Sequence, residues 1–337
     1  MGNQRIGMKI FITGGGGFLA RHIIQQLLTD AHEVTAYQRG DYSFLKEWGV
    51  ICIKGDLTDA KLLSESMQAH DVVFHVAAKA GVWGDYDEYY GANVVGTNNV
   101  LKACEENDIK YLVYTSTPSV VFNGEDEEGI NESEPYANKT FNAYQDTKII
   151  AEKAVLAANS DRFKTVCLRP HLIWGIGDPH IITRIVQRAR ANKLKLVKTV
   201  NKKMDACYVE NAASAHIKAM NELLDDAKCA GNAYFISNDE PMPINELINK
   251  ILHAANLQPA KKYVSAKLAF VLGGILETVY KVLRVKKEPL MTRYVAKQLS
   301  VSHWYDLSAA KNDFSYSADI TTEQGMKKLA EYFATQK

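Results

Sequence analysis

Tyr144 and Lys148 place a phenol and an ammonium group four residues apart, in the segment YQDTK. Residues at this spacing share one face of a helix, so the ammonium can lie beside the phenol or beside a cofactor ribose. A nearby positive charge favours the phenolate and lowers a pKa that is otherwise about 10. These residue types therefore suit proton exchange with a carbonyl or an alcohol near neutral pH.

The same spacing occurs at Tyr42 and Lys46 and at Tyr263 and Lys267, where a solvated helix face explains it. In an open parallel sheet, reactive groups lie beyond the carboxyl ends of the strands. Tyr144 alone follows the fifth predicted strand and begins a helix within the nucleotide-binding part of the chain. We therefore take Tyr144 as the candidate acid or base.

A run of hydroxyl side chains between Thr115 and Ser119 ends the fifth predicted strand. A hydroxyl at this place can form a hydrogen bond to a substrate oxygen while the charge on that oxygen changes. Without Tyr144 nearby in the sequence, a plain serine and threonine turn would be the better interpretation.

A glycine-rich turn follows the first predicted strand, the apolar run 9–13, and a helical pattern begins directly after it at Phe18. A strand, a glycine turn and a helix form the context that a dinucleotide-binding fingerprint requires. Gly14 permits the tight turn, and Gly17 lets the backbone N–H groups of the helix approach a pyrophosphate. Ala20 stands where a third glycine is common, and the pattern tolerates alanine there.

The end of the second predicted strand bears on the choice of cofactor. Sites that prefer NAD usually carry an acidic residue there, which binds the ribose hydroxyls. The sequence has Arg39 instead, and a guanidinium group can pair with a 2′-phosphate. We therefore expect NADP(H) to be preferred, with NAD(H) possible. Asp56, after the third strand, can accept a hydrogen bond from the adenine amino group or cap the next helix.

Short apolar strands alternate with helical stretches through the first half of the chain, which predicts a doubly wound parallel sheet of the α/β (Rossmann) class. The predicted strands are 9–13, 33–37, 50–53, 71–76, 111–114 and 165–168, and the clearest helices are 94–106 and 144–158. After Pro170 the pattern weakens and becomes mostly helical, with one more strand at 233–236. We expect a dinucleotide-binding domain over 1–173, with returning segments near 205–240. A smaller, mainly helical, interleaved substrate domain would comprise 174–204 and 241–337.

Composition excludes several classes of function. Lys and Arg number 40 against 39 Asp and Glu, so no basic field favours nucleic acid as a partner. The five cysteines are scattered without a CxxC pair, which argues against a metal site and suits a reducing cytosol. Met1 to Gly7 is short and polar and does not resemble a signal peptide. We expect a cytoplasmic protein without a metal.

The apolar stretch 268–276 is too short to cross a bilayer, which needs about 20 residues. Together with Val279, Tyr280, Val282 and Leu283 it can cover a deep apolar pocket, or it can be an ordinary core helix. Basic residues nearby (Lys281, Arg284, Lys286 and Lys287) also leave peripheral membrane contact and membrane association open.

Several motifs in a fixed order resemble the extended short-chain dehydrogenases/reductases of the 3β-hydroxysteroid dehydrogenase type. They are TGGGGFL at 13–19, GDL at 55–57, HVAA at 75–78, NVVGT at 93–97, the Tyr144/Lys148 pair, LRP at 168–170 and YVEN at 208–211. The resemblance covers nearly the whole chain. It implies a catalytic hydroxyl at Thr117, with Ser116 next in line, an acid/base at Tyr144, and a ribose-binding Lys148.

The resemblance also implies which residues hold the cofactor. With Arg39, Tyr144 and Lys148 they are Gly14, Gly17, Phe18, Leu19, Asp56, Leu57, Ala77, Ala78, Lys79, Thr115, Pro170, His171 and Ile173. His171 ends the sixth predicted strand, where a nicotinamide would lie. His75 ends the fourth strand, and we interpret it as a packed side chain.

Further segments narrow the resemblance within the family: AAKAGVWG at 77–84, YTSTPSV at 114–120, AVLAAN at 154–159 and RPHLIWG at 169–175. They resemble members that use NADPH to reduce a long-chain 2-alkyl-3-oxo acid to the 2-alkyl-3-hydroxy acid in bacterial olefin biosynthesis. Sterol-acting relatives share many of these segments, so an NAD(P)-dependent 3β-hydroxysteroid or sterol dehydrogenase is the alternative. A non-catalytic dinucleotide sensor is a further one. The resemblance implies a long-chain apolar substrate and a homodimer, and it leaves a larger pathway assembly open.

Overall fold

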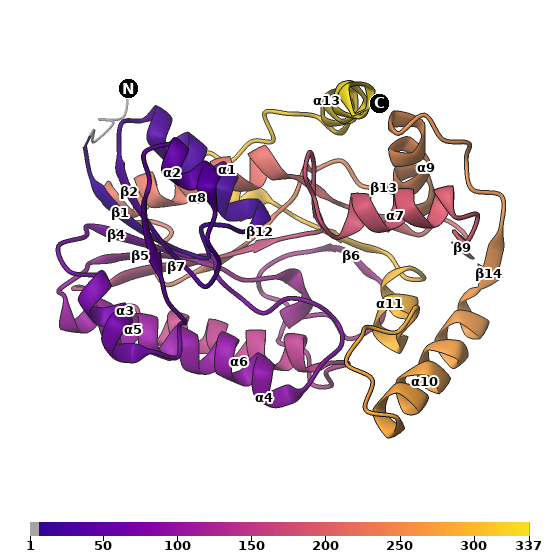
Figure 1. Cartoon of the computed structure of the whole chain (residues 1–337), viewed down its shortest axis with the longest axis horizontal. Helices are drawn as coiled ribbons and strands as arrows, with labels where there is room; N and C mark the ends of the chain where they lie inside the picture. Colours follow the sequence, from indigo (N-terminus) through magenta and orange to yellow (C-terminus); the bar gives the residue numbers. More distant parts are fainter. Residues whose placement is uncertain (1–6, 337) are drawn as a thin grey trace.

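The structure is a computed structural model and describes residues 7–336, so most of the segment Met1–Gly7 lies outside the described residues. Seven parallel strands form the central sheet, in the order β12-β7-β5-β4-β1-β2-β3 (Figure 1). Their bounds are β1 Lys9–Thr13, β2 Glu33–Gln38, β3 Ile51–Lys54, β4 Val72–His75, β5 Tyr111–Thr115, β7 Lys164–Pro170 and β12 Ala233–Ile236. The doubly wound α/β fold is confirmed, and each strand lies within two residues of its predicted bounds.

The strand β1 lies between β4 and β2. The chain adds β2 and β3 on one side of β1 and then adds β4, β5, β7 and β12 on the other side. The side chains of Ile10, Phe11 and Ile12 in β1 are fully buried, because helices cover both faces of the sheet. In such a sheet, a crevice opens beyond the carboxyl ends of the strands where the winding changes direction. The fold therefore directs attention to the ends of β1, β2, β4 and β5.

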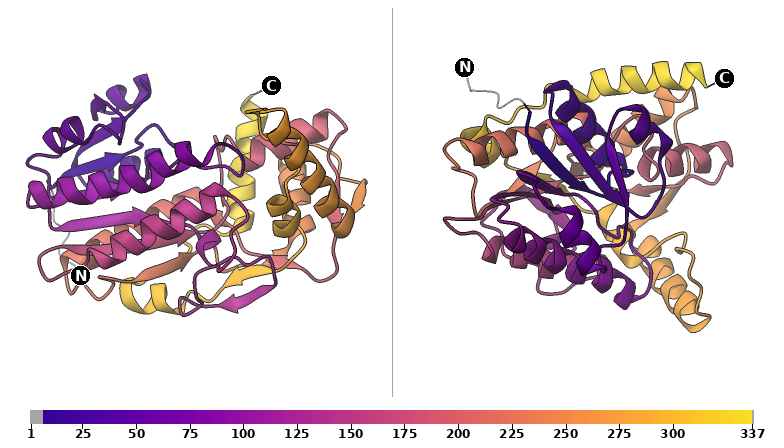
Figure 2. Two further views of the ribbon diagram at one scale, coloured as in Figure 1. Left: turned by 90° about the horizontal axis from the view of Figure 1, so that it is seen from below. Right: turned by 60° about the vertical axis from the view of Figure 1, so that its left-hand side comes forward.

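Helices cover both faces of the sheet, as Figure 2 shows. On one face, α1 (Phe18–Thr29) packs beside α8 (Val209–Leu224). On the other face lie α3 (Ala60–Ser66), α5 (Gly96–Glu106) and α6 (Ala143–Ala157). The predicted helix 94–106 begins earlier, because α4 (Tyr86–Tyr89) continues through the π-helical turn η1 (Tyr90–Val95) into α5. Short α2 (Ser43–Glu47), η2 (Pro118–Val120) and α12 (Ser308–Phe314) complete this part.

The chain beyond β7 contributes a second core around Trp174, Tyr208 and Ile251. It holds α7 (Ile181–Arg190), α9 (Ile244–Ala254) and α13 (Thr322–Thr335). The expectation of a mostly helical region is incomplete, because short strands also occur. They are β8 Ile173–Trp174, β9 Leu196–Lys198, β10 Lys203–Met204, β11 Cys207–Tyr208, β13 Met242–Pro243, β14 Tyr263–Ser265 and β15 His303–Tyr305. β6 Glu127–Ile130 precedes β7 in the chain and pairs with β15. Strands of two to four residues leave little periodicity to detect.

The helix α10 (Ala266–Val282) projects from the rest of the molecule (Figures 1 and 2) and packs against α11 (Arg293–Gln298). Ala269 and Gly273 are the buried residues of α10. A Cβ atom at Gly273 would lie 2.6 Å from the Thr292 carbonyl carbon, so the helix approaches α11 closely there. Because its other apolar side chains are not buried, α10 is not the core helix that the sequence allowed. Within the described residues, no helix combines the length and apolar composition needed to cross a membrane.

Candidate active site

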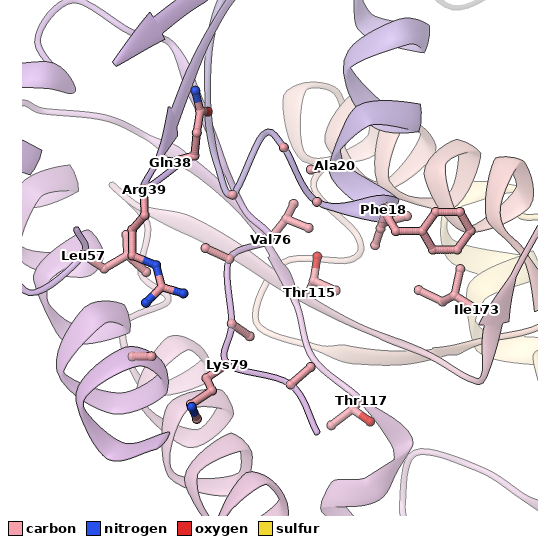
Figure 3. Close-up of a pocket in the computed structure, with 18 of the residues that line it drawn as sticks. Phe18, Ala20, Gln38, Arg39, Leu57, Val76, Lys79, Thr115, Thr117 and Ile173 are labelled. Atoms are coloured by element: carbon pink, nitrogen blue, oxygen red, sulfur yellow. The ribbon is translucent and has the colours of Figure 1, made fainter. Parts of the chain in front are cut away.

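A cavity of about 550 Å³ opens at the carboxyl ends of the central strands, within the usual size of a small-molecule site (Figure 3). The glycine turn, the segments after β2, β3, β4, β5 and β7, and the start of α6 line it. The predicted site residues among its lining are Gly14, Gly17, Phe18, Leu19, Arg39, Asp56, Leu57, Ala77, Ala78, Lys79, Thr115, Thr117, Tyr144, Lys148, Pro170 and Ile173. The structure thus brings together residues spread over 160 positions of the chain.

The glycine turn is held tightly against the segment that follows β4. Gly14 has a φ of +73°, and a Cβ atom there would lie 2.9 Å from the Cα of Ala77. Thr13 fixes this approach, because its Oγ1 accepts hydrogen bonds from the N–H groups of Val76 and Ala77, each at 3.1 Å. The helix begins at Gly17 without a side-chain cap, so its first N–H groups face the cavity. This cradle fits the pyrophosphate of a dinucleotide.

Asn93 holds the loop after β4, and sequence reasoning missed this role. Its Oδ1 accepts from the Lys79 N–H at 2.7 Å, and its Nδ2 donates to the Lys79 carbonyl at 3.1 Å. Asn93 is buried in the π-helical turn η1, which places its side chain toward the loop. The motif NVVGT contained the signal, because a buried amide in a helix needs partners outside that helix.

Arg39 and Asp56 lie at the adenosine end of this crevice, and both are exposed. The Arg39 side chain is 79% exposed, and its Nη1 lies 4.0 Å from Asp56 Oδ2. Hydrogen bonds from the N–H and the hydroxyl of Thr58 hold the pKa of Asp56 below its usual value. Asp56 does not cap the next helix, since the side chain of Asp59 accepts from the Leu62 N–H and caps α3. The Asp56 carboxylate is therefore ordered in a turn and faces the cavity.

Tyr144 and Thr117 meet at the other side of the cavity. Burial raises the pKa of the Tyr144 phenol, and a hydrogen bond from Thr117 opposes this shift. The expected lowering of this pKa by Lys148 is wrong for the structure described here, because Lys148 contacts other groups. The phenol is therefore protonated at neutral pH and can donate its proton.

Lys148 is 2% exposed, and its Nζ donates to the Tyr114 hydroxyl at 2.6 Å and to the Thr115 carbonyl at 2.7 Å. Burial lowers the pKa of Lys148 to about 7. An ammonium with this pKa changes its charge within the physiological range. Lys148 also lines the cavity, so a ribose bound there can reach it.

A buried polar network continues from there to the glycine turn. His75 binds Thr97 through Nε2 at 2.9 Å and Thr13 through Nδ1 at 2.8 Å. Burial lowers the pKa of His75 to about 3, so its ring stays neutral. The interpretation of His75 as a packed residue is confirmed. Its role is to support Thr13, which positions the loop of Val76 and Ala77.

Thr117 is held from the C-terminal part of the chain. It donates to Ser119 Oγ at 3.1 Å, and Ser119 Oγ lies 2.8 Å from the Tyr294 hydroxyl in α11. Ser116 Oγ, in contrast, is buried without a hydrogen-bond partner and lines the cavity. No pattern in the sequence indicates that Tyr294 supports Ser119, because only the fold brings α11 beside η2.

His171 is not among the residues that line the cavity. Pro170, Leu172 and Ile173 line it, and the chain leaves the extended conformation after β7, with a φ of +41° at Leu172. The His171 ring is buried instead, and its Nε2 lies 3.1 Å from Nδ1 of His303. Its predicted role at the nicotinamide is not supported by this placement.

Asp178, His180 and Ile181 line the cavity from the start of α7, and sequence analysis did not select them. Asp178 accepts hydrogen bonds from the N–H groups of His180 and Ile181, at 2.7 and 3.0 Å. The loop signal around Gly177 was visible, but only the fold brings it to the cavity. Among residues 7–336, no cluster of His, Cys, Asp or Glu could hold a metal ion.

Comparison with known proteins agrees with this geometry. The model of the 3-beta hydroxysteroid dehydrogenase/isomerase family matches residues 11–267. A 2-alkyl-3-oxoalkanoate reductase of Shewanella oneidensis is 50% identical over 95% of this chain and 84% of that protein. The human sterol-4-alpha-carboxylate 3-dehydrogenase, decarboxylating, is 31% identical over 98% of this chain and 90% of that protein.

Solved structures show the same fold. A UDP-glucuronic acid 4-epimerase from Bacillus cereus, in complex with NAD, aligns with a TM-score of 0.74 at 20% identity, over 98% of this chain and 99% of that one. The family match and the identities show what kind of protein this is. The chain belongs to the 3-beta hydroxysteroid dehydrogenase/isomerase family and is an NAD(P)-dependent oxidoreductase of the extended short-chain type that acts on CH–OH and C=O groups.

Proposed function

We propose that this protein uses NADPH to reduce a long-chain 2-alkyl-3-oxo acid to the 2-alkyl-3-hydroxy acid. The observation that carries the proposal is the meeting of Tyr144 and Thr117 at one side of the cavity, with the glycine cradle at the other. The reductase of Shewanella oneidensis, at half identity over nearly the whole chain, favours this substrate class.

A nicotinamide cofactor bound in the glycine cradle would supply the hydride that reduces the carbonyl carbon. Tyr144 donates its proton to the oxygen that gains negative charge, and its raised pKa keeps that proton available at neutral pH. The Thr117 hydroxyl, which donates to Ser119 Oγ in this structure, can turn its single proton to the same oxygen when a substrate binds. Lys148 holds the ribose, which positions the reacting carbon against the substrate.

The preference for NADPH rests on Arg39. Its guanidinium is exposed at the end of β2, where it can bind the 2′-phosphate in two parallel hydrogen bonds. Asp56, at 4.0 Å, is too loosely paired to compete with a phosphate. NADH lacks that phosphate and should bind more weakly.

Apolar side chains at the open side of the cavity suit an alkyl substrate. Leu172, Ile173 and Ile181 line it there, and Figure 3 shows Ile173 close to Phe18. They belong to the part of the chain that we assign to substrate binding, residues 174–204 and 241–337, or directly precede it. No residue of the described α10 lines the cavity, so the cover expected from 268–283 is not formed in this structure.

The test is reduction of NADP⁺ or NAD⁺ by a long-chain 2-alkyl-3-hydroxy acid, followed by nicotinamide absorbance. This direction avoids the 3-oxo acid, which decarboxylates readily. We expect turnover with the hydroxy acid and NADP⁺. Turnover only with a 3β-hydroxysteroid would favour the sterol dehydrogenase alternative, which the human relative supports. Cofactor binding without turnover of either substrate would favour the dinucleotide sensor.

We also propose that two copies pair through α5 and α6, which lie side by side on one face of the sheet (Figure 1). Val95 and Ile150 are 37% exposed there, and Tyr86 and Tyr90 stack at 6.0 Å beside them. A pair of helices from each copy would form a four-helix bundle. Sedimentation of the wild type and of Ile150→Glu tests this, with a dimer expected only for the wild type. A monomeric wild type would overturn it.

A further inference from the structure

The outer face of α10 is apolar and has no partner in the described part of the chain. Leu268, Val271, Leu272, Ile275, Val279 and Leu283 recur at three and four residue intervals and are 42–67% exposed. This spacing places them along one side of the helix. The opposite side is occupied, because Gly273 lies against the backbone at Thr292. The apolar face therefore lies on the side of α10 away from α11, and Figure 2 shows that α10 itself projects from the rest of the molecule.

The C-terminal end of α10 and the turn after it combine apolar and basic side chains. Val282 is 74% exposed and Leu290 is 71% exposed. Exposed basic residues occur in the same segment, namely Lys281, Arg284, Lys286 and Lys287. Lys267 is exposed at the other end of the apolar face.

The acidic residues of this segment are already paired. Glu277 accepts from Arg293 Nε at 2.7 Å, and both carboxylate oxygens of Glu288 accept from Arg184, at 2.7 and 2.8 Å. The local charge that remains is therefore positive. Since these are exposed groups, a surface with a high density of negative charge is the complementary partner.

The same segment is attached to both walls of the cavity. Trp83 Nε1 donates to the Val285 carbonyl at 3.0 Å, and Arg188 donates to the Leu290 carbonyl at 3.1 Å. Trp83 belongs to the loop whose Lys79 and Ala80 line the cavity, and Arg188 belongs to α7, whose first residue Ile181 lines it. The turn after α10 is thus tied to two elements that contribute residues to the cavity lining.

We propose that α10 and the turn after it dock the protein on the surface of an anionic lipid bilayer. An amphipathic helix of 17 residues lies in the plane of the interface, with apolar side chains among the acyl chains and basic ones at the headgroups. The long stems of the lysines allow their ammonium groups to reach the headgroup level. Each basic residue near an anionic surface strengthens binding by about fivefold.

A second copy of this chain fits the face less well. A parallel two-fold pair of α10 helices brings the two basic C-terminal ends together, and an antiparallel pair brings each of these ends beside Lys267 of the other copy, so like charges meet in both arrangements. A lipid surface has no such conflict. If the proposed function holds, docking would also place the cavity mouth where a long-chain apolar substrate dissolves.

The experiment is sedimentation of the full-length wild-type protein with vesicles, which needs neither cofactor nor turnover. Vesicles of phosphatidylglycerol and phosphatidylethanolamine are compared with vesicles of phosphatidylcholine alone. Val282→Glu/Leu283→Glu removes the most exposed apolar residues of α10. Its matched control is Val200→Glu, because Val200 is also 74% exposed but lies outside α10. Lys286→Glu/Lys287→Glu tests the charges.

We expect the wild type and Val200→Glu to sediment with the anionic vesicles. The apolar variant should lose binding, and the charge variant should bind at least about 25-fold more weakly. No sedimentation of the wild type, or unchanged binding of the apolar variant, would overturn the proposal. So would a lower molar mass of the apolar variant without lipid, since that result identifies a second copy as the occupant of the face.

Discussion

The two ends of the cavity are built differently. Around Tyr144 the polar groups are buried and joined by short hydrogen bonds, such as the 2.6 Å contact from Lys148 to Tyr114. Around Arg39 the charged groups are exposed, and the ion pair with Asp56 spans 4.0 Å. Figure 3 shows Arg39 beside Leu57 and apart from Thr117.

This difference indicates a division of work. Groups that must act on a reacting atom gain from fixed positions and from exclusion of water, since both strengthen their electrostatic effect. A group that only selects a cofactor can lie in solvent and close on its phosphate after binding. We therefore expect changes near Tyr144 to slow the reaction and changes near Arg39 to weaken cofactor binding.

Tyr144→Phe should have the largest effect. Loss of the phenolic proton removes the general acid, and we expect the turnover rate to fall by about 10³-fold. The affinity for NADPH, measured by fluorescence titration, should stay within about twofold of the wild type. Turnover at the wild-type rate would remove Tyr144 from the mechanism and break the proposed division.

Thr117→Val should reduce turnover by about 100-fold, because it keeps the side-chain shape but removes one hydrogen-bond donor at the reacting oxygen. Steady-state rates at saturating cofactor measure this effect. Ser116→Ala serves as the control, since its Oγ has no partner within the chain. If Ser116→Ala showed the larger loss, the catalytic hydroxyl would be Ser116.

Arg39→Ala should raise the KM for NADPH by about tenfold, which is the low end of the range for a hydrogen bond to a charged group. The KM for NADH and the turnover rate with either cofactor should change little. Lys61→Ala is a suitable control, because Lys61 is 86% exposed and does not line the cavity. An equal change for both cofactors would show that Arg39 does not read the phosphate.

The pH dependence of the free energy of unfolding should differ between the wild type and Lys148→Met, because the variant has no buried ammonium group. The pKa of Lys148 is about 7 in the folded chain, below its unfolded value, so folding releases a proton between the two values. Stability of the wild type relative to the variant should therefore rise with pH, by about 1 kcal/mol from pH 7.5 to 8.5. Urea unfolding at the two pH values measures this, and a constant difference would contradict it.

Most strands of the central sheet and the glycine cradle could be predicted from the sequence. Strands such as β1 are continuous apolar runs, and Gly14 has the positive φ that its place in the motif requires. These features are local, so pattern and spacing predict them. The rule that active groups gather at the carboxyl ends of the strands selected Tyr144 and the hydroxyl run 115–119, and the family resemblance singled out Thr117 within that run.

What the sequence could not predict depends on the direction of side chains and on distant contacts. His171 contacts His303 in β15, which lies 132 positions further along the chain, and no local pattern indicates this contact. The contact of Tyr294 with Ser119 joins positions 175 residues apart. The sequence did not predict the exposure of α10 either, because apolar residues at helical spacing occur both in buried helices and in helices that project from a protein.

The most direct test measures binding and hydride transfer separately in Arg39→Ala, Tyr144→Phe and the double variant. Affinity for NADPH is titrated, and the single-turnover reduction of NADP⁺ by a 2-alkyl-3-hydroxy acid is followed at saturating cofactor. We expect Arg39→Ala to change only the affinity for NADPH and Tyr144→Phe to change only the rate of hydride transfer. The double variant should show both effects in full. A slowed single turnover in Arg39→Ala, or lost NADPH binding in Tyr144→Phe, would contradict these expectations.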